Sequence, residues 1–212
     1  MKTDYHCHIL PGLDDGAQSR EEAVCLARQL VRWGFQRAVC TSHIAYLYRN
    51  TPRMIKEACA CLEQDLRKQS ITLELVPSAE YRLIPETWHR VVENRWFLPW
   101  DDKYLLLELP IRNRDQLGNI DPLQEIERMK EFGFVPVIAH PERYVWLSHE
   151  ELTEFCKQGA LLQINYPSLC GRYGEEIKQR ADGLITGGYA SFYGTDLHSE
   201  DYVSCLDAWF AG

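Results

Sequence analysis

Two histidines separated by a single residue stand near the start of the sequence, at His6 and His8. Residues two apart in a β-strand lie on the same face, so both imidazoles would point one way and Cys7 the other. Paired imidazoles at a strand end are suitable ligands for a divalent metal ion. Pro11-Gly12 ends this strand, and the turn at residues 14–16 can bring a carboxylate back to the same place. The alternative is a pair of histidines that are merely hydrogen-bonded near the start of the chain.

Further histidines and carboxylates stand where other predicted strands end. With the first pair, the candidate ligands are His6, His8, Asp15, His43, Glu80, Glu108, His140, Asp196 and His198. Each alone could be a capped core histidine or a solvated charge, but nine at equivalent positions favour a metal site. Imidazole and carboxylate ligands without thiolate suit manganese, iron or zinc. Nine ligands are too many for one ion, so we expect a cluster of two or three. His89 and His149 fall in predicted helices and are interpreted as surface residues.

Strands and helices alternate along the whole sequence. Strands are predicted at residues 4–10, 37–43, 71–81, 104–108, 134–140, 160–165 and 189–196, and helices between them, with one short helix in the tail. This alternation predicts a parallel sheet with right-handed crossovers. Seven such units favour a closed or nearly closed (β/α) barrel, whose active site would lie at the carboxyl ends of the strands. An open doubly wound sheet is the alternative, although no Gly-x-Gly-x-x-Gly opens a helix.

Local signals mark the helix ends. Capping boxes are predicted at Ser19 to Glu22 and at Ser148 to Glu151. Thr51-Pro52 and Asp121-Pro122 place proline at the first helical position, and Gly34 is the first of several glycines that end a helix.

Composition limits the classes of partner. The 212 residues are 45% hydrophobic and carry a formal net charge of −8, so we expect a single domain over residues 1–212 that binds neither nucleic acid nor anionic membranes. Bound cations would still allow an anionic substrate. We find no apolar run long enough for a membrane span and no signal-peptide pattern, so the expected location is cytoplasmic. The eight cysteines form no Cys-x-x-Cys motif and are interpreted as reduced core residues.

Five stretches resemble the PHP (polymerase and histidinol phosphatase) superfamily, and within it the manganese-dependent protein tyrosine phosphatases of bacterial capsule and exopolysaccharide loci. They are residues 6–16, 41–43, 79–81, 138–144 and 194–198, so the resemblance covers nearly the whole chain. It implies a distorted seven-stranded (β/α) barrel, TIM-like and of the PHP fold, with a trinuclear site. Two departures are Ser42, where relatives commonly carry proline, and the lack of an arginine shortly after His198.

The resemblance also implies roles for individual residues. The nine candidate ligands would hold three ions in overlapping groups: His6, His8, Glu80 and Asp196; then Glu80, Glu108 and His140; then Asp15, His43 and His198. Arg143 would contact the phosphate, and it is assigned a catalytic role together with Glu80 and His140. Arg49 and Tyr46 are expected to bind substrate, and Arg49 or Arg53 could replace the missing arginine.

The implied function is metal-dependent hydrolysis of phosphotyrosine in a protein by a metal-bridging hydroxide. The substrate would be the tyrosine-rich tail of a bacterial tyrosine kinase that controls capsule or exopolysaccharide synthesis. A small-molecule phosphomonoesterase such as a histidinol phosphatase is one alternative, and a non-catalytic metal-binding scaffold is another. Tyr46, Tyr48 and Tyr81 could line a mouth for an aromatic ring or simply pack at its rim. A cysteine nucleophile is not expected, because no His-Cys-x5-Arg motif is present. The sequence does not indicate the oligomeric state.

Overall fold

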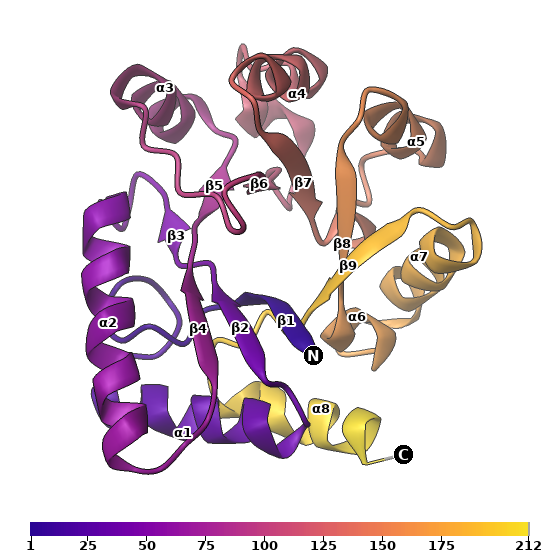
Figure 1. The fold of residues 1–212 in the computed structure, drawn as a ribbon. Helices are drawn as coiled ribbons and strands as arrows, with labels where there is room; N and C mark the ends of the chain where they lie inside the picture. Colours follow the sequence, from indigo (N-terminus) through magenta and orange to yellow (C-terminus); the bar gives the residue numbers. More distant parts are fainter. Residues whose placement is uncertain (212) are drawn as a thin grey trace.

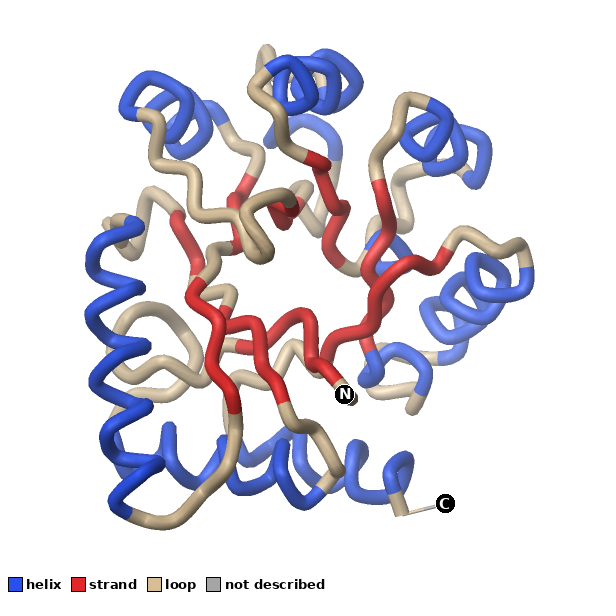
Figure 2. Tube along the Cα trace, viewed as in Figure 1, coloured by secondary structure: helices blue, strands red, loops and turns tan. Residues whose placement is uncertain are grey.

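Parallel strands form the inner wall of the molecule and helices surround them, as Figures 1 and 2 show. The computed structural model describes residues 1–211. Its strands are β1 Thr3–Cys7, β2 Arg37–Cys40, β3 His43–Ile44, β4 Glu74–Pro77, β5 Glu80–Arg82, β6 Tyr104–Glu108, β7 Val135–Ala139, β8 Leu161–Asn165 and β9 Ala190–Gly194. Gly212, the end of the predicted domain, lies outside the described residues.

The helices lie outside the strands (Figure 2). They are α1 Arg20–Arg32, α2 Pro52–Lys68, α3 Pro85–Asn94, α4 Pro122–Glu131, α5 His149–Lys157, α6 Tyr166–Leu169, α7 Glu175–Thr186 and α8 Val203–Phe210, with short 3₁₀ turns η1 Arg114–Leu117, η2 Pro141–Arg143 and η3 Glu200–Tyr202. Among residues 1–211, no helix has both the length and the apolar character needed to cross a membrane.

The barrel consists of two sheets. One has the order β1-β2-β4 and the other β3-β5-β6-β7-β8-β9. They join where β1 passes β9: the His8 amide donates to the Leu197 carbonyl at 3.0 Å, and the Asp196 amide donates to the His6 carbonyl at 2.7 Å. The predicted barrel is therefore confirmed, and the open doubly wound sheet is wrong.

Two predicted strands are each divided in the structure. The stretch predicted at 37–43 is β2 and β3, and the stretch predicted at 71–81 is β4 and β5, with the members of each pair in different sheets. The breaks fall at Thr41-Ser42 and Ser78-Ala79, all buried. The barrel changes direction at these small residues, which gives nine strands at seven strand positions and accounts for the distortion.

The apolar core has an outer and an inner part. The larger cluster joins the strands to the surrounding helices. The smaller one includes Val39, Leu106 and Val137, one from each of three strands, and packs against Phe192. Trp100, which precedes β6 and is bridged to Tyr104, belongs to the same group. These side chains fill the barrel interior, so the polar residues are left to the carboxyl ends of the strands.

The two predicted capping boxes differ. At α5 both hydrogen bonds between Ser148 and Glu151 are present. At α1 the Ser19 hydroxyl accepts from the Glu22 amide at 3.1 Å, but the Glu22 carboxylate accepts from the amide of Gln18 at 2.8 Å and not from that of Ser19. The first helix therefore has a serine cap, and the prediction of a complete box there is wrong.

Candidate metal centre

The carboxyl ends of the strands bring all nine candidate ligands together. Their ligand atoms form four overlapping groups, and within each group the atoms lie within 4.8 Å of one another. The groups are His8, Asp15, His43 and His198; His6, His8 and Asp196; His6, Glu80 and His140; and His43, Glu80 and Glu108. The shared members make this one continuous cluster of imidazoles and carboxylates.

Glu80, the first residue of β5, lies at the centre of the cluster. Its Oε2 atom is 3.2 Å from His6 Nε2 and 3.3 Å from His8 Nε2. Its Oε1 atom is 3.2 Å from His140 Nε2, and Oε2 is also 3.2 Å from His43 Nδ1. The side chain is almost fully buried. One carboxylate thus faces four imidazoles from three other strand ends.

His6 and His8 point into the same cluster, with their Nε2 atoms 3.0 Å apart. Strand β1 ends at Cys7, one residue before His8, yet the alternation of side chains continues through it. Cys7 is buried on the other side, and its thiol donates to the Val39 carbonyl at 3.4 Å. The thiol is therefore directed away from the cluster.

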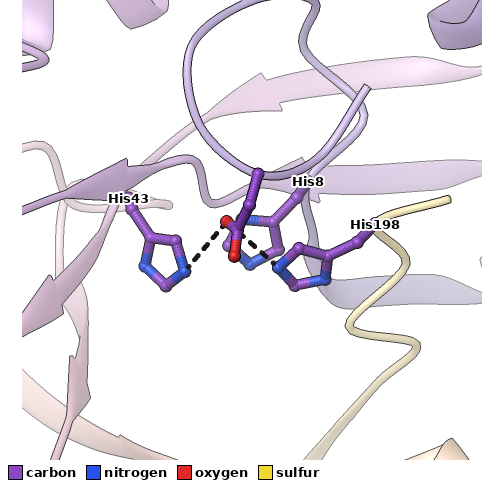
Figure 3. Close-up of side chains that lie close together, drawn as sticks. His8, His43 and His198 are labelled. Carbon is purple, nitrogen blue, oxygen red and sulfur yellow. Dashed lines mark ion pairs between the residues drawn. The ribbon is translucent and has the colours of Figure 1, made fainter. Parts of the chain in front are cut away.

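Asp15 faces the cluster from the loop after β1. Its Oδ1 atom lies 3.6 Å from Nε2 of both His43 and His198. Figure 3 shows these two imidazoles and that of His8 directed toward one carboxylate. The rings of His8 and His198 stack with centroids 3.9 Å apart. Both distances from Asp15 Oδ1 are longer than a hydrogen bond, so these nitrogen and oxygen atoms face one another without being bonded to each other.

A second set of residues, which was not predicted from the sequence, holds the imidazoles in place. His8 Nδ1 lies 3.0 Å from Asp14 Oδ2, and His6 Nδ1 lies 2.8 Å from Gln163 Oε1. Both oxygens accept, so each ring donates through Nδ1 and its Nε2 atom is directed into the cluster, where it can bind a metal ion once deprotonated. Asp14 also accepts from the His43 amide at 2.7 Å. The polar residues Gln163 and Asn165 in an otherwise apolar predicted strand were the sequence feature that could have indicated these supporting contacts.

Two of the candidate ligands have a left-handed backbone. The φ angle is 30° at His140 and 49° at Asp196. Such conformations cost about 1–3 kcal/mol each and occur mainly at functional sites. Asp196 is fixed further by its Oδ2 atom, which accepts from Asn165 Nδ2 at 2.8 Å and from Arg143 Nη1 at 3.1 Å.

The charge of the cluster fits bound cations. The carboxylates of Glu80, Glu108 and Asp196 are buried together, and the fixed positive charges that contact the three are those of Arg82 and Arg143. Buried carboxylates are costly unless they are paired or coordinate metal ions. Glu108 Oε2 also makes no hydrogen bond within residues 1–211. The donor set therefore fits divalent ions that prefer nitrogen and oxygen ligands.

The pKa shifts follow from burial and from neighbouring charges. Burial lowers the pKa of His6, but the Glu80 and Asp196 carboxylates outweigh this effect and raise it to about 9. Burial, with the charge of Glu80, raises the pKa of Glu108 to about 8. Burial lowers the pKa of His43 and that of His140, each to about 4. Burial also lowers the pKa of His8, but the Asp14 and Glu80 carboxylates outweigh this effect and raise it well above its usual value. In the metal-free protein, His6, His8 and Glu108 therefore hold protons at neutral pH.

These protons predict the pH dependence of metal binding. An ion that binds to His6, His8 and Glu108 must displace their protons, so the affinity should rise as the pH rises through about 8 to 9. His43 and His140 are already neutral above pH 6 and add no dependence there. Calorimetric titration with Mn²⁺ between about pH 6.5 and 8.5 should show tighter binding at higher pH, with proton release. Affinity that stays constant over this range would contradict the expectation.

A cavity of about 330 Å³ opens above the cluster. Its walls include Arg82, Ile111, Arg143 and Tyr202 as well as most of the candidate ligands. Arg143 is 23% exposed, so its guanidinium can meet a ligand there. The ring of Tyr173 packs against this guanidinium at 4.5 Å.

The other predicted substrate-binding residues lie outside this cavity. Arg49 and Tyr46 line a separate small hollow between the loop after β3 and helix α3. Arg53 is exposed and paired with Glu57 on α2. Tyr48 stacks on His43 with centroids 5.7 Å apart. Tyr81 is buried and donates its hydroxyl to the Trp96 carbonyl at 2.8 Å, so it neither lines a mouth for an aromatic ring nor packs at its rim.

The fold and the cluster together define a (β/α) barrel with an imidazole- and carboxylate-rich cluster at the carboxyl ends of its strands that could hold metal ions. A family model described as capsular polysaccharide synthesis, CpsB/CapC, matches residues 2–204. The chain therefore belongs to the CpsB/CapC family.

Similar proteins agree with this assignment. The chain is 31% identical to the tyrosine-protein phosphatase YwqE of Bacillus subtilis over 199 residues, 92% of this chain and 77% of that protein. It matches a chain from the crystal structures of YwqE and of CpsB from Streptococcus pneumoniae, described as unique metal-dependent tyrosine phosphatases, with a TM-score of 0.80 and 29% identity over 99% of this chain and 88% of that one. A histidinol phosphate phosphatase from Lactococcus lactis, complexed with zinc, L-histidinol and phosphate, shares the fold, with a TM-score of 0.55 and 11% identity over 99% of this chain and 92% of that one.

Proposed function

We propose that the protein is a metal-dependent tyrosine phosphatase that acts on a phosphotyrosine-bearing bacterial tyrosine kinase involved in capsule or exopolysaccharide synthesis. The observation that carries this proposal is the cluster of nine nitrogen and oxygen donors beneath a cavity that also contains Arg143. Family membership supports the reaction class, and the names of YwqE and CpsB support phosphotyrosine as the substrate.

The cluster would hold two or three Mn²⁺ ions, with iron or zinc as the other metals that suit its ligands. His6, His8, Asp15, His43, Glu80, Glu108, His140, Asp196 and His198 would be the ligands. Bound ions supply a water of lowered pKa and neutralise phosphate charge. Metal analysis of protein purified without added ions tests which metal the site prefers.

The remaining catalytic work belongs to side chains that position the substrate. Phosphoryl transfer depends on charge neutralisation and alignment more than on covalent help from the protein. Arg143 presents a fixed guanidinium that suits a phosphate, held by Asp196 and by the Tyr173 ring. Glu80 and His140 would contribute to catalysis as ligands of the metal ions. Arg49 and Tyr46, outside the cavity, would contact parts of a protein substrate beyond the phosphotyrosine.

Comparing two substrates tests the proposal. The Mn²⁺-loaded protein should hydrolyse phosphotyrosine peptides with a higher kcat/KM than histidinol phosphate. A clear preference for the small ester would favour the histidinol phosphatase alternative. Absence of phosphatase activity in a protein that binds Mn²⁺ normally would favour the scaffold alternative. Dephosphorylation of a purified bacterial tyrosine kinase tests the partner.

The metal mechanism makes Cys7 dispensable. Its thiol is buried, and burial raises its pKa, so it is protonated and directed toward the Val39 carbonyl. Cys7→Ala should therefore retain kcat within about threefold of wild type, because a protonated buried thiol is not a nucleophile. Assays with p-nitrophenyl phosphate check this result. A loss of several orders of magnitude, with normal metal content, would instead indicate a cysteine nucleophile.

A further inference from the structure

Arg82 lies in the wall of the cavity, although its position in the sequence predicts no role for it. It is the last residue of β5, two positions after Glu80, so both side chains lie on the same face of the strand. The residue opposite it on β6 is Glu108, and Arg82 Nε lies 3.3 Å from Glu108 Oε2. The Arg82 side chain is 33% exposed and faces the cavity.

The contact with Glu108 uses one edge of the guanidinium. An arginine carries five N–H donors, of which Nε holds one. Within residues 1–211, Glu108 is the ion-pair partner of Arg82, and the two terminal nitrogens make no hydrogen bond to a protein acceptor. The other donors thus remain available in the cavity, in a planar fork that matches phosphate oxygens.

Arg143 reaches the same cavity from a different strand. It belongs to η2, directly after β7, and its Nη1 atom contacts Asp196. Strand β6 lies between β5 and β7, so Glu108 at the end of β6 stands between the two arginines in strand order. Arg82, Glu108 and Arg143 all line the same cavity.

We propose that Arg82 binds a phosphate oxygen of the substrate from the β5 side while Arg143 binds from the β7 side. This assignment rests on the proposed phosphatase function. A phosphate monoester carries two negative charges at neutral pH and can satisfy both guanidinium groups, whereas a phosphodiester carries one. The pair would therefore favour monoesters over diesters, and Arg82 would contribute to substrate specificity.

Two substitutions of Arg82 test the proposal by phosphate binding and by specificity. The probe is inorganic phosphate, titrated calorimetrically into Mn²⁺-loaded protein. Arg82→Gln should weaken phosphate binding about tenfold or more, the usual effect of losing a charge-assisted contact. The ratio of kcat/KM for p-nitrophenyl phosphate to that for bis(p-nitrophenyl) phosphate should fall as well. Arg82→Lys should give intermediate values, because it keeps the charge and loses the planar fork.

Arg37→Gln is the matched control. Arg37 on β2 also contacts its strand partner through Nε, at 3.3 Å from Glu74 Oε1, but it lies at the start of the strand, away from the cavity. The Arg37→Gln substitution should leave the phosphate affinity and the monoester-to-diester ratio of kcat/KM unchanged.

Manganese content, measured on the same samples, separates a phosphate contact from a purely structural role. If phosphate affinity and the substrate ratio are unchanged in Arg82→Gln, or fall only in proportion to manganese content, Arg82 merely holds Glu108 and the proposal is overturned. Phosphate binding is measured without turnover. A wild-type protein that binds phosphate but does not hydrolyse phosphotyrosine peptides would refute the proposed function and leave the test of Arg82 intact.

Discussion

Glu80→Gln is expected to lower kcat/KM for a phosphotyrosine peptide by about 10³-fold or more, because lost metal charge stabilisation is worth several kcal/mol. The Glu80 carboxylate contacts four imidazoles, those of His6, His8, His43 and His140. Glutamine keeps the shape but removes the negative charge and replaces one oxygen by an NH₂ group that cannot bind a metal. Steady-state kinetics and manganese content of the same samples measure the effect.

Glu125→Gln provides the matched control for this substitution. Glu125 is also a buried glutamate, but it lies on α4 and pairs with Arg128 at 3.0 Å, outside the barrel. This variant should bind manganese and turn over substrate as the wild type does. If Glu80→Gln kept its manganese and its activity, Glu80 would not be a metal ligand, and the arrangement of ions around it would have to be abandoned.

The barrel could be predicted from the sequence because the patterns that mark its strands and helices are local. Most strands are apolar runs followed by a polar residue, and most helices have a capping residue or an N-terminal proline. Parallel strands bring their carboxyl ends to one rim, so His43, Glu108 and His140 could be placed together without knowing the loops. The same logic, with the family resemblance, gave all nine residues that the structure brings into one cluster.

Other features depend on tertiary structure and could not be predicted in this way. The breaks at Thr41-Ser42 and Ser78-Ala79 follow from how the two sheets meet. Pro77, the last residue of β4, precedes the second break, but no proline or glycine adjoins the first. Tyr81 alternates onto the outer face of β5, where its hydroxyl also accepts from the Leu98 amide at 2.7 Å.

The positions of the arginine side chains also depend on tertiary structure. Arg49 follows a strand end, as Arg143 does, but the direction of its loop places it in another hollow, whereas Arg82 within the strand reaches the cavity. Sequence position identifies which strand end a residue follows, and loop direction decides which cavity the side chain enters.

Gly16→Ala is expected to destabilise the fold by about 3 kcal/mol, at the upper end of overpacking effects, and to weaken metal binding. A Cβ atom at Gly16 would lie 2.0 Å from the His8 carbonyl oxygen and 2.6 Å from the His8 Cβ. The loop after β1 is held at this point, because the Ala17 amide donates to the same carbonyl at 3.0 Å and the Gly16 amide donates to Asp14 Oδ1 at 3.0 Å. Relieving the clash must move His8 or the Asp14-Asp15 turn, and both belong to the metal centre.

Gly183→Ala is the control for this glycine substitution. Gly183 lies inside α7, and a Cβ atom there would meet nothing within 4 Å. Alanine should therefore stabilise the protein by about 0.5–1 kcal/mol through its better helix propensity. Urea unfolding with and without Mn²⁺ measures both variants. A Gly16→Ala protein as stable as the wild type, with unchanged Mn²⁺ affinity, would show that the loop can shift without moving His8, and that the close contact does not fix the geometry of the metal centre.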